Sequence, residues 1–195
     1  WAAKDAQKVK QIYKGNFLID GSRGIVHIGE VIEMVMDGFQ QVIDGGILAK
    51  EPCVKMKVYL MDMKLHEDAI HRGPAQVLPA VRESVRLALG DAKATMFEPL
   101  QILQIESPAE FLGEISKLIQ NKRGQLLDTT QEGEHMTVKA KLPVAEMFGL
   151  SNDLRSGTGG RGTFYIVDQV FEKVPEMIQN KLIKQIRDRK GLKTE

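Results

Sequence analysis

The first half of the chain alternates between two patterns of apolar side chains. Residues 54–60 (Val-Lys-Met-Lys-Val-Tyr-Leu) change between apolar and polar at each step, which is typical of a strand with one buried face. Residues 29–43 carry apolar side chains three and four positions apart and are followed by two glycines, which predicts an amphipathic helix that ends there. One or two short strands are expected within residues 8–20. The pattern therefore predicts an α+β unit for residues 1–97.

A second helix follows this strand after an unusually long connection. Leu78, Val81 and Val85 are spaced as on one helical face, and Pro79 is expected in the first turn, where its missing N–H is not needed. The connection, residues 66–78, fits neither the strand nor the helix period and is crowded with polar side chains. Long connections inside compact units are often functional. We therefore predict a loop that is displayed between a strand and a helix.

The second half, residues 98–195, has a clearer order of elements. Strands and amphipathic helices follow one another as β-α-β-β-α-β, which is the ferredoxin-like arrangement. Ser107 is predicted to cap the first of these helices, with Pro108 at its first position. An extra amphipathic helix is expected at residues 175–190. We therefore expect two α+β domains, residues 1–97 and 98–195, of which the second carries the C-terminal helix.

Composition narrows the class of protein. Hydrophobic residues make up 43% of the 195 positions and charged residues 27%, as in a soluble globular chain, and the net charge of +1 does not by itself indicate a nucleic-acid partner. Cys53 is the only cysteine and is expected to be a small buried side chain, which suits a reducing, cytoplasmic location. No apolar run is long enough for a membrane span. The chain lacks an initiator methionine, which indicates a start within a longer protein.

Two chemical motifs are approximated but not matched. His66, Glu67 and His71 have the composition of a zinc motif, but the histidines are five positions apart in a loop instead of four apart on a helix. Asp68 would be a third ligand, so a metal-dependent hydrolase on His66, Asp68 and His71 stays an alternative. Residues 157–162 are rich in glycine like a dinucleotide-binding loop, but they precede a strand, the reverse of the required order. We predict no catalytic residue and no bound metal.

The side chains of the long loop suit contact with RNA or with a protein. Arg72 lies in the loop, and Arg82 and Arg86 are one turn apart on the supporting helix, where they would form a stripe that contacts phosphates. Gly73 would let the backbone come close to a partner. The alternative is a long polar connection whose histidines merely face water, which is the more frequent case for an arbitrary loop.

The most specific motif in the chain is His66-x-Asp68-Ala69-Ile70-His71-Arg72-Gly73-x-x-Gln76. It resembles the tip of the fourth domain of elongation factor 2, the translocase of archaea and eukaryotes. The segments Gly38-Phe39-Gln40, Asn121-Lys122-Arg123-Gly124-Gln125 and Leu142-Pro143-Val144 resemble the same family. Gly73-Pro74-Ala75, where eukaryotic members have three glycines, points to an archaeal-type member.

The resemblance covers essentially the whole chain, which would be the fourth and fifth domains of the factor. It implies a fold like the second domain of ribosomal protein S5 for the first half and a ferredoxin-like fold for the second. GTP and Mg²⁺ would be bound by a G domain that this chain lacks. No cofactor and no enzymatic activity are therefore expected of the chain itself.

The resemblance also implies roles for individual residues. His71 matches the histidine that the family converts to diphthamide and that diphtheria-type toxins ADP-ribosylate, so the modifying enzymes and these toxins are expected partners. The principal expected partner is the ribosome with its tRNA and mRNA, because the tip of the family enters the small-subunit decoding region during translocation. The neighbouring tip residues are matched by His66, Asp68, Ile70, Arg72, Gly73 and Gln76.

Two further readings stay open besides the metal site. In the first, the chain comes from a paralogous translational GTPase of ribosome assembly or of the spliceosome. In the second, it is a plain RNA-binding module like a ribosomal protein. The intact run Asp68-Ala69-Ile70-His71-Arg72-Gly73 argues against the first. The second would tolerate His71→Ala without loss of translocation.

Overall fold

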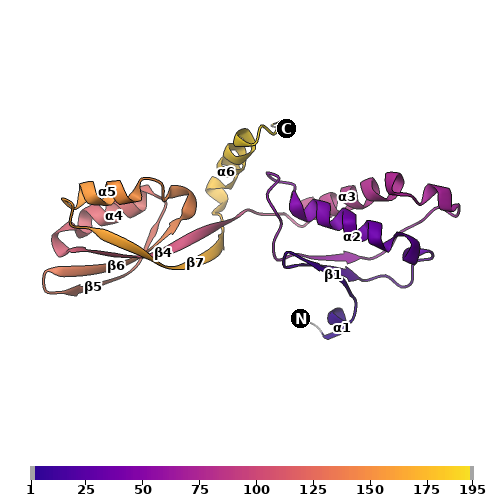
Figure 1. The fold of residues 1–195 in the computed structure, drawn as a ribbon, viewed down its shortest axis with the longest axis horizontal. Helices are drawn as coiled ribbons and strands as arrows, with labels where there is room; N and C mark the ends of the chain where they lie inside the picture. The colour runs from indigo at the N-terminus through magenta and orange to yellow at the C-terminus, as the bar shows by residue number, and fades with distance from the viewer. Residues whose placement is uncertain (1–2, 194–195) are drawn as a thin grey trace. The chain divides into compact units, whose positions relative to one another are not determined.

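The computed structural model describes residues 3–193, which form two compact units, each with its own sheet and helices (Figure 1). The first unit extends to Thr95 and includes the C-terminal segment from Met177, and the second unit is Met96–Glu176. The outermost residues of the predicted domains, 1–2 and 194–195, lie outside the described part. Within that part no helix is both long and apolar enough to cross a membrane.

The first unit is a three-stranded sheet with two long helices on one face (Figure 1). The strands lie in the order β1-β2-β3, and β3 runs parallel to β2 because α2 crosses over between them. This is an α+β arrangement, as the sequence pattern predicts, and it is consistent with the S5 domain 2-like fold that the resemblance implies. In chain order the elements are α1 (Ala3–Ala6), β1 (Val9–Tyr13), β2 (Asn16–Asp20), α2 (Ile28–Asp44), β3 (Lys57–Leu60) and α3 (Pro74–Asp91).

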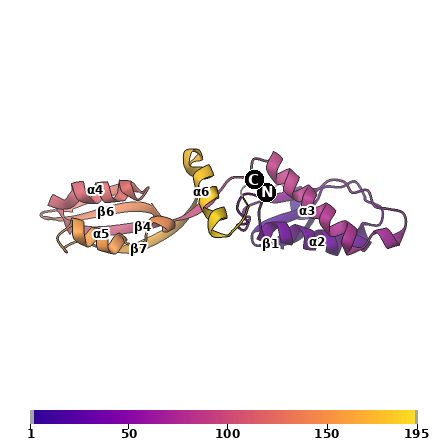
Figure 2. The ribbon, with the colours of Figure 1, turned by 90° about the horizontal axis from the view of Figure 1, so that it is seen from above.

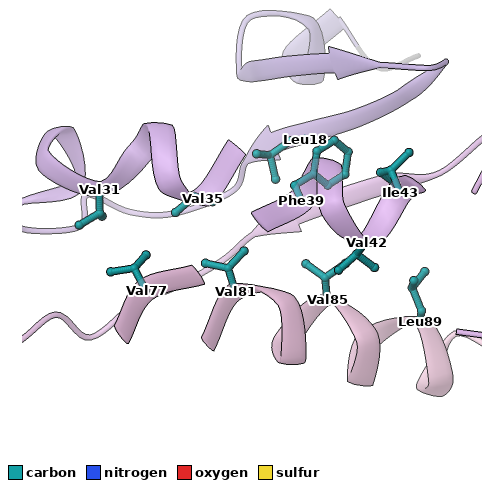
Figure 3. Close-up of a cluster of buried hydrophobic side chains, with 10 residues drawn as sticks. All are labelled: Leu18, Val31, Val35, Phe39, Val42, Ile43, Val77, Val81, Val85 and Leu89. Carbon is teal, nitrogen blue, oxygen red and sulfur yellow. The ribbon is translucent and has the colours of Figure 1, made fainter. Parts of the chain in front are cut away.

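Helices α2 and α3 lie side by side (Figures 1 and 2) and enclose one apolar layer. Figure 3 shows side chains of α2 and α3 that point toward one another, with Leu18 of β2 beside them. Gly38 lies at a close approach of the two helices, since a Cβ at this position would stand 2.8 Å from Cγ1 of Val81. The buried members of the layer are Leu18, Val31, Val35, Phe39, Val42, Ile43, Val77, Val81, Val85 and Leu89.

The start of α3 corrects the predicted extent of the loop. Gly73 is the N-cap and Pro74 occupies the first turn, so the loop ends at Gly73 and the predicted range 66–78 is wrong at its C-terminal end. Pro79 lies inside the helix, where it removes one backbone hydrogen bond. Burial of Val77, one turn before Val81, offsets that loss. The proline that stands at the start of the helix is Pro74, and this position suits proline.

The second unit has the predicted ferredoxin-like fold. Its strands lie in the order β5-β6-β4-β7, all neighbours are antiparallel, and α4 and α5 cover one face (Figure 1). A core of aliphatic side chains between this face and the helices is centred on Leu103, Ile105 and Ile119. The elements are β4 (Phe97–Pro108), α4 (Leu112–Asn121), β5 (Gln125–Glu132), β6 (His135–Pro143), α5 (Leu150–Gly157) and β7 (Thr163–Lys173).

The predicted cap at Ser107 is wrong. Ser107 and Pro108 still belong to β4, where they pair with Met136 and His135 of β6, and a 3-10 turn at Ala109–Phe111 leads into α4. The hydroxyl of Ser107 donates to the carbonyl of Pro108 instead of capping a helix. Continued pairing with β6 therefore outweighs the local cap signal.

The C-terminal helix α6 (Glu176–Arg189) has the predicted extent but packs with the first unit. Nη1 of Arg187 donates to the carbonyl of Leu48 at 3.0 Å. Nζ of Lys190 donates to the carbonyl of Ala49 at 3.1 Å and pairs with the carboxylate of Glu51 at 2.7 Å. The sequence groups this helix with the second half, whereas these contacts with the segment that follows α2 place it in the first unit.

Replacing Gly38 with alanine is expected to lower the free energy of unfolding of the first unit by about 1–3 kcal/mol, because the added methyl group meets Val81 between two packed helices. The matched control is Gly90→Ala in α3, where a Cβ would meet nothing within 4 Å. The control should leave stability unchanged or raise it by up to ~1 kcal/mol. Urea unfolding measures both, and a wild-type midpoint for Gly38→Ala would contradict the close approach.

Candidate functional site

The loop that precedes α3 is held in shape by short-range hydrogen bonds. Asp68 is the N-cap of a 3-10 turn at Ala69–His71, and its Oδ1 accepts the amide of Ile70 at 3.1 Å. The amide of Asp68 in turn donates to Nδ1 of His66 at 3.0 Å, so this ring nitrogen is the acceptor. The loop therefore has a defined backbone instead of an irregular course.

The loop presents four of the predicted tip residues to solvent. His66, Asp68, Ile70 and His71 are exposed, and Ile70 is 74% exposed. The rings of His66 and His71 meet edge to face with their centroids 4.6 Å apart. The structure thus brings together the side chains that the motif grouped, on the outside of one short turn.

Arg72 is the exception among the tip residues, because its side chain is only 7% exposed. Nη1 donates to the carbonyls of His66 and Glu67 at 2.7 and 2.6 Å. Nε and Nη2 both contact Oε2 of Glu30 in α2, at 2.9 and 2.7 Å. The guanidinium therefore binds groups inside the first unit. The sequence, in contrast, predicts that this side chain reaches toward a partner.

Glu30 stands in the first turn of α2, where a carboxylate also suits the partial positive charge of the helix N-terminus. The hydrogen bond from Arg72 is the main reason that the pKa of the Glu30 carboxyl is below its usual range, and His27, whose Nδ1 lies 2.7 Å from Oε1, acts in the same direction. The carboxylate is therefore ionised at neutral pH. No local motif reveals this role, because Glu30 and Arg72 are 42 positions apart.

The other predicted residues lie at the start and on one flank of α3. Gln76 is exposed in the first turn, and Gly73 has φ −81°, a conformation that any residue adopts. Arg82 and Arg86 are half-buried one turn apart, and Nη1 of Arg82 donates to Oε1 of Gln41 in α2 at 3.1 Å. Their guanidinium groups keep further donors that could reach an anion.

The described residues bear on two other kinds of site, a metal site and a reactive cysteine. Residues 3–193 contain no group of three or more His, Cys, Asp and Glu side chains placed to hold a metal ion. His66, Asp68 and His71 do not form such a group in the described residues. Cys53 is only half-buried, whereas the sequence predicts a buried side chain. Its partial burial raises the pKa of its thiol, which disfavours the reactive thiolate.

Both units match known protein families. Residues 1–93 match the family described as elongation factor G, domain IV, and residues 95–182 match the family described as elongation factor G C-terminus. The two matched segments meet close to the boundary between the compact units at Thr95 and Met96.

Archaeal proteins are similar to the chain over nearly all of its length. It is 50% identical to elongation factor 2 of Nanoarchaeum equitans over 97% of its residues, and 50% identical to elongation factor 2 of Methanocaldococcus jannaschii over 98%. Elongation factor 2 of Methanococcus aeolicus is 46% identical over 98% of the chain. The chain spans about a quarter of the length of these curated relatives, 25% of the first and 26% of the other two.

Asp68→Ala removes the cap of the turn that presents His71 and is expected to raise the hydrogen-exchange rate of the Ile70 amide about fivefold, the factor for a cap of about 1 kcal/mol. Asp68→Asn is the matched control, because its amide oxygen accepts the same hydrogen bond and should keep the exchange rate near that of the wild type. NMR-detected amide exchange measures both variants. Equal rates for the two variants would contradict a capping role.

Proposed function

The chain belongs to the elongation factor 2 family, and on that basis we propose that it works in translation elongation as the part of the factor that reaches into the ribosome. The loop at Leu65–Gly73 would enter the small-subunit decoding region and support the codon–anticodon helix while tRNA and mRNA advance. The ribosomal RNA, tRNA and mRNA are the proposed partners, and the cytoplasm is the proposed location.

One observation carries this proposal. Ile70 and His71 are exposed on a turn whose backbone is fixed by the buried side chain of Arg72. A loop that acts by occupying a defined place among RNA strands must keep its shape before it binds, since ordering a flexible loop costs free energy on binding. A polar connection that merely faces water has no need of an arginine buried beneath it.

The contacts that such a loop would make are sequence-independent. Double-helical RNA is recognised through its shallow minor groove, where 2′-hydroxyls and phosphates accept and donate hydrogen bonds. His66 and His71 carry ring nitrogens at the exposed turn, and Arg82 and Arg86 offer cationic groups on the flank of α3 that suit phosphates. The proposed role is therefore to occupy space and to form hydrogen bonds, without breaking bonds.

His71 is the proposed site of modification to diphthamide. Its exposed ring would be accessible to the enzymes that build the modification and to toxins that transfer ADP-ribose from NAD to it. A cationic arm on this ring would extend the reach of the turn toward RNA phosphates. GTP and Mg²⁺ would act in another part of the full-length factor, which we propose to be a GTPase.

The test is the mass of the peptide that carries His71, purified from the native archaeal host. We expect a mass increment on His71 and, after incubation with NAD and a diphtheria-type toxin, a further increment of one ADP-ribose. The matched control is protein made in a bacterial host, which lacks the modifying enzymes and should give an unmodified, toxin-resistant peptide. An unmodified and toxin-resistant His71 from the native host would overturn the modification and favour the paralogous or the plain RNA-binding reading.

A further inference from the structure

The pair Glu30–Arg72 connects the loop to the first turn of α2. We propose that Glu30 is a positioning residue, which acts through Arg72 to fix the conformation in which the loop presents Ile70 and His71. This inference rests on the proposed function for its consequence in translation, but its structural part stands on contacts within the first unit. Glu30 lies outside the loop and outside the motif that identifies the loop.

The first step is the anchoring of Glu30 itself. It precedes Val31, which is fully buried, and α2 continues through the buried residues Val35 and Phe39. The backbone of Glu30 is therefore fixed by the core of the unit. Its side chain is 47% exposed, and both oxygens are engaged, Oε1 by Nδ1 of His27 and Oε2 by Arg72. The carboxylate thus has a defined direction toward the loop.

The second step is the orientation of the guanidinium. Nε and Nη2 of Arg72 share Oε2 of Glu30, which turns Nη1 toward the backbone of the loop. Charged hydrogen bonds of this kind are shorter and about twice as strong as neutral ones. Because a buried guanidinium without a counter-charge is costly, the carboxylate also makes burial of Arg72 favourable.

The third step is the contact between Arg72 and the backbone that precedes the exposed turn. Nη1 of Arg72 donates to the carbonyls of two successive residues, His66 and Glu67. These residues come directly before Asp68, which caps the turn of Ile70 and His71. The position of the turn therefore follows from the position of Arg72. Without Glu30 the guanidinium would be more stable in water, and the two carbonyls would lose their donor.

The experiment compares Glu30→Gln with Glu33→Gln in the 195-residue chain. Glu33 lies on the same helix and is exposed, so the control removes the same charge from a neighbouring position of α2. In Glu30→Gln we expect the Nε–H resonance of Arg72 to move toward the value of a solvent-exposed arginine. We expect the amide exchange of Ile70 and His71 to rise about tenfold or more, the factor for loss of a charge-assisted hydrogen bond.

The Glu33→Gln control should leave the Arg72 resonance in place and change these exchange rates by less than about twofold, as for an ordinary surface substitution. The Arg72 resonance separates positioning from general stability, since a uniform loss of stability would speed exchange in the whole unit without moving this signal selectively. An unchanged Arg72 signal and unchanged loop exchange in Glu30→Gln would overturn the inference.

A second measurement uses the full-length factor and separates this inference from the proposed function. Glu30→Gln and His71→Ala are each compared with wild type in single-round translocation on ribosomes. We expect both variants to be slower and Glu33→Gln to be unaffected. If neither variant slows translocation while the loop of Glu30→Gln is loosened, the proposed function fails and the positioning role holds. If only His71→Ala is slow and the loop of Glu30→Gln is unchanged, the positioning role fails and the proposed function holds.

Discussion

The close packing of α2 on α3 is the constraint on which the first unit depends. Gly38 leaves room for Val81 and no more, so the two helices are fixed against one another along their apolar faces. Glu30 lies in the first turn of α2, and α3 begins at the end of the displayed loop. This packing sets the separation between the carboxylate of Glu30 and the end of the loop, and Arg72 spans that separation.

The buried arginine explains how a polar loop can be both exposed and ordered. Its side chain donates hydrogen bonds to two backbone carbonyls of the loop. The turn is therefore held without apolar contacts of its own, and Ile70 and His71 can face outward. Arg72 would look like a phosphate-binding residue from its charge alone. Its function in this fold is instead to orient the side chains beside it.

The second unit has a sheet of four antiparallel strands. Its first and last residues lie close together, since the amide of Val174 near the end of the unit donates to the carbonyl of Met96 at its start. The chain then returns to the first unit through α6. Arg187 of this helix and Lys190, which directly follows it, bind carbonyls and a carboxylate within residues 48–51. Part of the positive charge at the C-terminus thus has an internal role.

Much of the architecture was predictable because it depends on periodic burial. The alternation in β6 and the helical spacing in α2 correspond to real buried faces, and the order of elements in the second half gave the ferredoxin-like fold. Local cap signals were less reliable. Pro79 and Ser107 looked like helix starts, but burial of Val77 and strand pairing of Ser107 outweighed them.

The grouping of the site residues was also predictable, but their directions were not. His66, Asp68, Ile70 and His71 are all exposed on one short loop. The inward direction of Arg72 and the participation of Glu30 depend on a contact across 42 positions, which no local pattern encodes. The same holds for α6, whose partners lie about 140 positions earlier in the chain.

Site-specific cross-linking is the sharpest test of the proposal that this loop reaches the decoding region of the ribosome. A photoreactive amino acid would replace Ile70 in the full-length factor, because this side chain is 74% exposed. We expect cross-links to small-subunit RNA of the decoding region or to the bound tRNA and mRNA. Cross-links confined to other parts of the ribosome, with the factor bound, would contradict it.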